Sequence, residues 1–215
     1  MKTHTLESQS SMTPRNALQI LKEGNQRFVN NLKASRNLLQ QVNETREGQW
    51  PFAVILSCID SRTSAELIFD QGLGDVFSIR IAGNIVNTDI IGSIEFACKV
   101  AGSKLIVVMG HSKCGAIKGA CDGVKMGNLT HLLGKIDDAI ALETETVGER
   151  NADNAAFVER VAELNVMLVK RQIMERSPLL TAMIETSDIA LLGGMYDVDS
   201  GEVDFYDARM LMGTA

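Results

Sequence analysis

The sequence of 215 residues is poor in histidine and cysteine. It contains three histidines, so a site built from three of them would have to include His4 in the polar N-terminal stretch. It contains four cysteines: Cys58, Cys98, Cys114 and Cys121. In an intracellular chain, so few cysteines are more typical of metal ligands, nucleophiles or buried thiols than of a disulfide framework.

Long hydrophobic runs and long basic runs are also missing. An apolar segment such as LIVVMG, residues 105–110, falls far short of the roughly 18–20 residues that a membrane helix needs. The opening residues, MKTHTLESQSSM, lack the apolar stretch of a secretory leader. The net charge of −6 and the pI near 5.1 argue against broad binding to phosphate backbones. We therefore expect a cytoplasmic protein that binds neither a membrane nor nucleic acid.

The composition favours one globular domain. Hydrophobic residues make up 45% of the chain, which is enough to bury one substantial core. Neither an internal repeat nor a low-complexity linker divides the sequence. We expect a disordered lead-in over residues 1–12 and a single domain over residues 13–215.

Hydrophobic patterns beyond residue 51 alternate between strands and helices. Thr13 and Pro14 are typical of a helix start and predict an N-terminal helical arm. Apolar, partly β-branched runs predict strands over residues 52–58, 75–81, 104–111 and 188–198, with 202–207 pairing back through the turn at 199–201. Helical patterns cover residues 64–70, 90–100, 130–142 and 155–176. The pattern predicts an α/β fold with a mainly parallel sheet flanked by helices.

Three side chains that bind zinc well fall at strand ends. Cys58 ends the first predicted strand, His111 ends the third, and Cys114 follows near a helix start. Functional groups of open α/β sheets gather outside the carboxyl ends of strands. Three thiolate and imidazole ligands leave a fourth position open, which is typical of catalytic zinc. We predict one Zn²⁺ per chain, and we interpret Cys98 and Cys121 as core thiols and His131 as a surface or packed residue.

Asp60 and Arg62 follow Cys58 directly. An arginine can hold a carboxylate through two hydrogen bonds and fix its direction. Without zinc nearby, such a pair would simply stabilise a loop. Close to a metal ligand, Asp60 would either accept a hydrogen bond from zinc-bound water or occupy the fourth coordination position itself.

Three blocks of the sequence resemble the β-class carbonic anhydrases. They are CIDSRTSAELIFDQGLGDVFSIRIAGN, IVVMGHSKCGAIKGA and IALLGGMYDVDSGEVDF, and the likeness runs from about residue 13 to residue 205. The resemblance implies zinc on Cys58, His111 and Cys114, with Asp60 and Arg62 as the catalytic pair. It also implies reversible hydration of CO₂ to bicarbonate and a proton, through a zinc-bound hydroxide.

The same resemblance implies further site residues and an assembly. Gln49, Phe77 and Gly115 would line the substrate pocket, and the backbone of residues 83–84 would lie around it. The family forms homodimers, often doubled to homotetramers, with the site near the subunit interface. Phe96 stands where many relatives have a tyrosine. Ile55 stands where relatives with a non-catalytic bicarbonate pocket have a tryptophan, which argues against that pocket although Arg80 and Tyr196 match other parts of it.

Two other functions fit the same motifs. One is hydrolysis of a CO₂ analogue, carbon disulfide or carbonyl sulfide, on the same zinc scaffold. The other is a non-catalytic zinc-binding or redox-sensing protein, with a closed four-ligand site or a reversible disulfide between Cys58 and Cys114. The Asp60–Arg62 pair counts against the second alternative.

Overall fold

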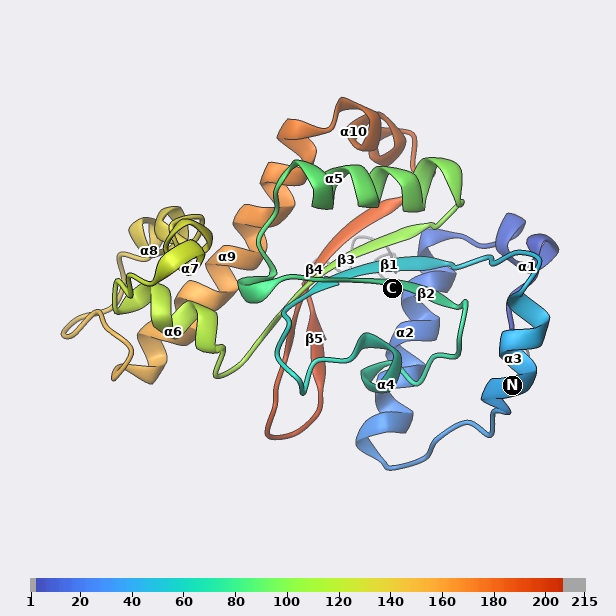
Figure 1. The fold of residues 1–215 in the computed structure, drawn as a ribbon, viewed down its shortest axis with the longest axis horizontal. Helices are drawn as coiled ribbons and strands as arrows, with labels where there is room; N and C mark the ends of the chain where they lie inside the picture. The colour runs from blue at the N-terminus through green and yellow to red at the C-terminus, as the bar shows by residue number, and fades with distance from the viewer. Residues whose placement is uncertain (1–2, 207–215) are drawn as a thin grey trace, which may run out of the picture.

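The computed structural model describes residues 3–206 and is built on a five-stranded sheet in the order β2-β1-β3-β4-β5 (Figure 1). Four strands run parallel, and the short β5 pairs antiparallel with β4. Their bounds are β1 Ala53–Ser57, β2 Val76–Arg80, β3 Leu105–His111, β4 Ala190–Tyr196 and β5 Val203–Phe205. The prediction of a mainly parallel α/β sheet with a hairpin at its C-terminal edge is confirmed.

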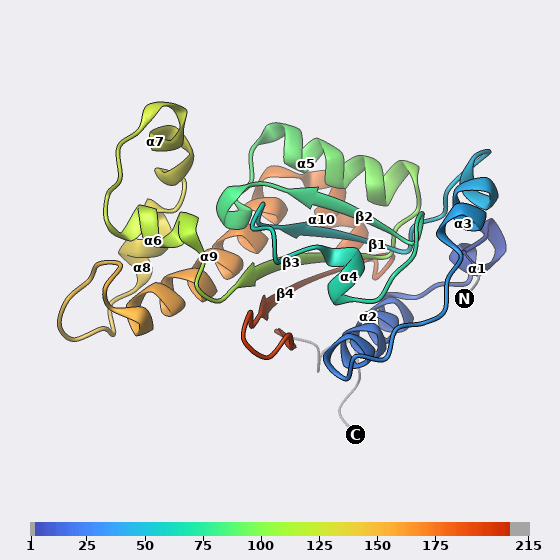
Figure 2. The same ribbon diagram turned by 60° about the horizontal axis from the view of Figure 1, so that its bottom comes forward.

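Helices cover both faces of the sheet, as Figure 2 shows with α5 above it and α2 below. One face carries α5 Thr88–Glu95, which runs on into the π-helical turn η2 Phe96–Val100, together with α9 Ala155–Arg176 and α10 Pro178–Glu185. The other face carries α2 Pro14–Val29 and α4 Ala65–Ile68. Within residues 3–206, every helix is too short or too polar to span a lipid bilayer.

Alternation along the central strands explains why the core divides in two. Val54 and Leu56 of β1 pack toward α9, whereas Ala53 and Ile55 pack toward α2. Successive side chains of a strand point to opposite faces, so an entirely apolar strand must be covered on both sides. All five residues of β1 and all seven of β3 are buried. The sheet is therefore a rigid platform for whatever follows its strands.

A helical corner projects beyond the sheet at the N-terminal end of α9 (Figure 1). It contains α6 Gly115–Cys121, α7 Gly127–Leu133 and α8 Asp137–Leu142. The prediction of one helix over residues 130–142 is wrong, because α7 ends at Leu133, with Gly134 as its C-cap, and α8 begins at Asp137. Asp137 and Asp138 lie in the first turn of α8, where acidic side chains favour a helix start.

From residue 3 onward, the N-terminal region differs from the prediction of a disordered lead-in over residues 1–12, of which residues 1 and 2 lie outside the described residues. Residues 6–10 form the short helix α1 (Leu6–Ser10), which begins with a reciprocal cap between Thr5 and Ser8. Gln9 is buried, and its amide donates to the carbonyls of Pro51 at 2.9 Å and Ala101 at 2.7 Å. Polar side-chain bonds hold this segment, and an apolar periodicity does not reveal them.

A second polar stretch also forms a helix that the sequence pattern did not predict, α3 Leu38–Thr45. Asn37 caps its start, and the buried Gln41 accepts a hydrogen bond from the backbone of Leu73 at 3.2 Å. The helix is therefore tied to the loop that leads into β2 by an amide instead of a broad apolar face.

Candidate metal centre

The proposed ligands lie at a topological switch point of the sheet. The chain passes from β1 through α4 to β2 on one side, and then returns through α5 to β3 on the other side of β1. The carboxyl ends of β1 and β3 therefore diverge into loops, which is where open α/β sheets place their ligand sites. Cys58 follows β1, His111 ends β3, and Cys114 is the N-cap of α6.

The three side chains converge in the structure. The sulfurs of Cys58 and Cys114 and a ring nitrogen of His111 all lie within 4.8 Å of one another, and all three residues are buried. The two sulfurs are 3.9 Å apart. Two sulfurs bound tetrahedrally to one zinc at about 2.3 Å stand about 3.8 Å apart, so the observed spacing fits that ion.

The orientation of His111 also fits a metal ligand. Its Nδ1 lies 2.9 Å from the carbonyl oxygen of Ser112, which can only accept, so Nδ1 carries the proton. The other nitrogen, Nε2, is buried and has no hydrogen-bond partner among the described residues. A metal-binding histidine is typically held in this way, with the second nitrogen free to donate its lone pair.

The pKa values of the two thiols shift in opposite directions. A hydrogen bond from Cys114 lowers the pKa of Cys58 to about 4 against the effect of burial, and the backbone N–H groups of Asp60 and Gly83 add to the shift. The pKa of Cys114 is raised in turn, by that thiolate and by burial. A bound cation would favour deprotonation of both sulfurs.

Asp60 and Arg62 form the ion pair that their spacing predicts. Arg62 donates from Nε to Oδ1 at 2.9 Å and from a terminal nitrogen to Oδ2 at 2.8 Å, while its backbone N–H donates to Oδ1 at 3.0 Å. These bonds lower the pKa of Asp60 well below its usual value. Asp60 is not part of the close group of three ligands, and Arg62 holds its carboxylate as an oriented acceptor.

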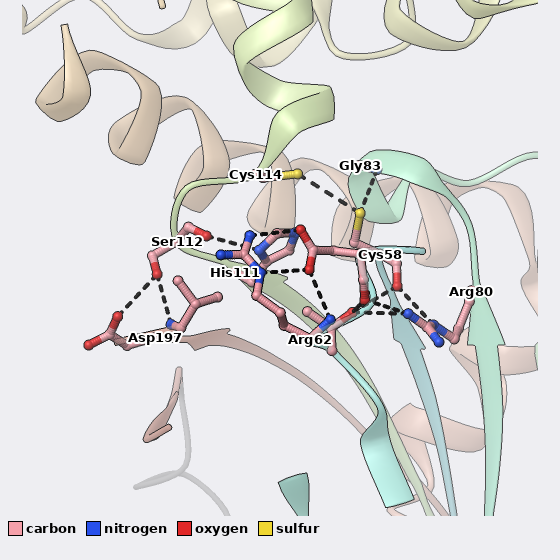
Figure 3. A network of polar contacts seen from close by, with 11 residues as sticks. Cys58, Arg62, Arg80, Gly83, His111, Ser112, Cys114 and Asp197 are labelled. Carbon is pink, nitrogen blue, oxygen red and sulfur yellow. Dashed lines mark hydrogen bonds and ion pairs between the residues drawn. The ribbon is translucent and has the colours of Figure 1, made fainter. Parts of the chain in front are cut away.

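The backbone of the loop after β1, which carries Cys58 and Asp60, is fixed by Arg80, whose role the sequence analysis missed. Arg80, at the end of β2, donates to the carbonyl oxygens of Cys58 at 3.0 Å and Asp60 at 2.6 Å (Figure 3). Thr63 donates to the same two carbonyls at 2.9 and 2.8 Å. The position of Arg80 beside the end of β1 could have suggested this role, since the two strands are paired up to Ser57 and Arg80.

The loop after β3 is anchored to the β4–β5 hairpin. The hydroxyl of Ser112 donates to Asp197 at 3.1 Å and accepts from the backbone of Val198 at 2.9 Å (Figure 3). The Ser112 N–H also donates to the carbonyl of Tyr196 at 2.9 Å. Ser112 is therefore fixed from three directions, and it presents its own carbonyl to His111.

The predicted substrate residues lie in different places. Gly115 begins α6 directly after Cys114, but Phe77 pairs with Val54, four residues before Cys58. Four residues along a strand correspond to roughly 13 Å. Gln49 precedes β1 and lies beside Gly74, which precedes β2, so it sits at the opposite, amino ends of these strands. A single chain therefore does not bring Gln49 and Phe77 to the three ligands.

Phe77 instead lines an open groove of about 520 Å³ between β2 and α5. Its ring meets that of Phe96 edge-on at 6.3 Å, and Phe96 is 54% exposed. The strand β2 is an edge of the sheet. An aromatic groove thus lies at a sheet edge, away from the ligands of the same chain.

The residues assigned to the core behave largely as predicted. Cys98 is buried, and burial raises its pKa to about 12. Cys121 is only half-buried, and its pKa is raised to about 11. His131 is exposed on α7, and Ile55 is wholly buried in β1.

The fold and the site together define an α/β protein with a zinc centre of the catalytic type. A family model described as carbonic anhydrase matches residues 53–203, so the chain belongs to the carbonic anhydrase family. It is 36% identical over 194 residues to carbonic anhydrase 2 of Mycobacterium tuberculosis, covering 89% of this chain and 92% of that protein. It is 33% identical over 190 residues to the carbonic anhydrase of Mycolicibacterium smegmatis, covering 87% and 91%.

Solved structures agree with these relatives. The β-carbonic anhydrase CafA of Aspergillus fumigatus superimposes with a TM-score of 0.68 at 30% identity, covering 79% of this chain and 82% of that one. A tetrameric β-carbonic anhydrase from Sordaria macrospora gives a TM-score of 0.64 at 28% identity, covering 77% and 85%. The architecture described above is therefore that of the β-class enzymes.

Proposed function

We propose that this chain is a zinc-dependent β-class carbonic anhydrase, a lyase that interconverts CO₂ with bicarbonate and a proton. The convergence of the Cys58 and Cys114 sulfurs with the free Nε2 of His111 carries the proposal. Membership of the carbonic anhydrase family supports it. These three residues would hold one Zn²⁺ per chain, and the set leaves one coordination position for a small ligand.

Zinc, when bound, lowers the pKa of water from 15.7 to about 7 and so supplies a nucleophile near neutral pH. The residues of the chain would direct that chemistry. Asp60, held by Arg62, offers an oriented carboxylate oxygen that would accept a hydrogen bond from a donor next to the metal. Because Arg62 keeps the pKa of Asp60 low, this acceptor stays ionised at neutral pH. Whether Asp60 can also swing from Arg62 to the fourth position stays a prediction.

We infer that the working form is a homodimer or homotetramer. Gln49 and Phe77 are distant from the ligands of their own chain, so they can line the CO₂ pocket only from a second copy. The aromatic groove at the β2 edge offers a surface for such a copy. The tetrameric state of the Sordaria macrospora relatives is consistent with this assembly. A cytoplasmic location stays a prediction.

The two alternatives are less well supported. Hydrolysis of carbon disulfide or carbonyl sulfide would use the same ligands, but the curated relatives are named carbonic anhydrases. A redox sensor would need a reversible disulfide between Cys58 and Cys114, and it would have no use for the oriented Asp60–Arg62 pair beside them. The buried Nε2 of His111 instead faces them, as a ligand would.

Stopped-flow assays on protein of measured zinc content test this function. We expect rapid CO₂ hydration and much slower turnover of carbonyl sulfide and carbon disulfide. Zinc-loaded protein that turns over the sulfur analogues but not CO₂ would transfer the assignment to the first alternative. Protein that binds zinc and acts on none of the three gases would favour the second alternative, a non-catalytic zinc-binding or redox-sensing protein.

A further inference from the structure

A buried amide interrupts the apolar stripe of α9. Asn165 is 1% exposed, and it stands where helical spacing from Val158, Val161 and Ala162 requires an apolar residue. Asparagine is a poorer helix former than leucine, and burying an amide is costly unless it is hydrogen-bonded. Packing alone would be better served by an aliphatic side chain at this position.

The donor half of this amide reaches the metal centre through one intermediate residue. Asn165 Nδ2 donates to the carbonyl oxygen of Gly83 at 2.9 Å. The N–H of Gly83 in turn donates to the sulfur of Cys58 at 3.4 Å (Figure 3). A single residue of the turn η1 (Ala82–Asn84) therefore links the amide of α9 to a proposed zinc ligand.

The turn requires such external support. Gly83 has φ of +67° and Asn84 has φ of +43°, so two consecutive residues adopt the left-handed conformation. A Cβ on Gly83 would approach the side chain of Ile136 to 3.0 Å and that of Ala116 to 3.4 Å. The turn is confined between these neighbours, and its direction decides whether the Gly83 N–H points at the sulfur.

The acceptor half of the amide carries a further clue. Asn165 Oδ1 is buried and has no hydrogen-bond partner among residues 3–206. A leucine, with the same number of side-chain heavy atoms, would avoid that cost, but it would leave the Gly83 carbonyl without this donor. The bond to Gly83 is therefore the contact that distinguishes asparagine from an aliphatic residue here.

We propose that Asn165 is a positioning residue of the metal centre, which holds Gly83 so that its N–H donates to the Cys58 sulfur. The inference rests on the zinc site proposed above. A hydrogen bond to a thiolate ligand stabilises charge on the sulfur and fixes the ligand's direction, and such supporting contacts tune both metal affinity and reactivity.

Zinc affinity and the spectrum of the cobalt-substituted protein test the proposal. Asn165→Leu removes the donor but keeps the number and branching of the side-chain heavy atoms, and Asn165→Ser leaves a polar group too short to reach Gly83. Val169→Ala is the matched control, because it truncates a buried residue of the same helix that has no bond to η1. Competition with a chelator gives the affinity, and the sulfur-to-cobalt charge-transfer band reports on the thiolates.

We expect both Asn165 variants to bind zinc about 10-fold more weakly and to shift the charge-transfer band. Val169→Ala should lower the unfolding temperature but leave affinity and band unchanged. Variants that keep wild-type affinity and spectrum and lose only stability would overturn the proposal. If wild-type protein itself fails to bind zinc or cobalt, the proposed function is at fault instead of the role of Asn165. Serine serves as the decisive variant should leucine fail to fold.

Discussion

Surroundings, more than burial, distinguish the cysteine at the metal centre from a core cysteine. Cys58 and Cys98 are each 3% exposed. The sulfur of Cys58 receives hydrogen bonds and lies beside a second thiol and an imidazole, which lowers its pKa. Burial instead raises the pKa of Cys98 to about 12, so Cys98 remains a neutral thiol. A thiolate is the form that binds metal, which makes Cys98 a natural control for Cys58.

Substitutions of the three proposed ligands should therefore lower the zinc content, whereas substitutions of the other two cysteines should not. We expect Cys58→Ser, His111→Ala and Cys114→Ser each to lose most bound zinc, because each removes one of only three protein ligands. Cys98→Ser and Cys121→Ser should retain about one zinc per chain. Metal analysis after gel filtration measures this directly. Full zinc retention in a ligand variant would remove that residue from the site.

Asp60 should affect turnover without affecting metal content. Asp60→Asn keeps the three ligands but cannot act as a charged acceptor, so we expect intact zinc and roughly a 100-fold loss of CO₂ hydration. Arg62→Ala should also keep zinc and lose activity, because nothing then holds the carboxylate away from the metal. An Asp60→Asn enzyme with wild-type turnover would show that this carboxylate has no part in the reaction.

The pH profile follows from the same pair. Arg62 holds the pKa of Asp60 below the ordinary value near 3.9, so Asp60 stays ionised from mildly acidic pH upward. A rise in wild-type activity between about pH 6 and about pH 9 would then report the water at the metal and not Asp60. We expect that rise, with zinc retained throughout. A flat profile would contradict it.

At the scale of elements, a buried ion cluster ties α2 to the loop that follows it and to the end of α4. Asp70 is buried and pairs with Arg27 at 2.5 Å and with Arg36, and it accepts from the backbone of Ala34 at 3.1 Å. Burial raises the pKa of Asp70, but Arg27 and Arg36 lower it by more. The carboxylate is therefore the favoured form in the folded chain.

Removal of that charge should destabilise the fold. We expect Asp70→Asn to lower the free energy of unfolding by roughly 3 kcal/mol, because it leaves a buried arginine without its counter-charge. The wild-type advantage is present above about pH 4, the unfolded pKa, and is lost as pH falls through the lowered folded pKa. Urea unfolding measures both. Glu145→Gln, which breaks an exposed pair with Arg160, should cost under about 1 kcal/mol, and an equal cost in both variants would refute the account.

Elements with apolar periodicity were predictable, and elements held by polar contacts were not. The strands and α9 can be predicted from their apolar residues, because both faces of the sheet must be covered. The helices α1 and α3 depend on Gln9 and Gln41, whose backbone partners lie far away in sequence. At the site, CxDSR and HxxC predicted the ligands, and the pairing of β1 with β2 hints at Arg80, but the contact of Asn165 with Gly83 depends on how the turn η1 folds.

At the scale of the whole molecule, the aromatic groove at the β2 edge should determine the assembly. We expect the wild type to sediment as a dimer or tetramer at micromolar concentration. Phe96→Glu replaces an exposed ring that contacts Phe77 with a charged side chain, and we expect it to weaken association and to lower CO₂ hydration, with zinc retained. Val147→Glu, on an exposed loop elsewhere, is the control and should change neither property. A fully active monomer would contradict a pocket shared between copies.

The most direct test of the central claim is the rate of CO₂ hydration as zinc is returned to metal-free protein. The account predicts that activity rises in proportion to bound zinc and stops rising at about one zinc per chain, since Cys58, His111 and Cys114 form one three-ligand site. Metal-free protein that hydrates CO₂ at the full rate, or zinc bound at that stoichiometry with no hydration, would contradict it.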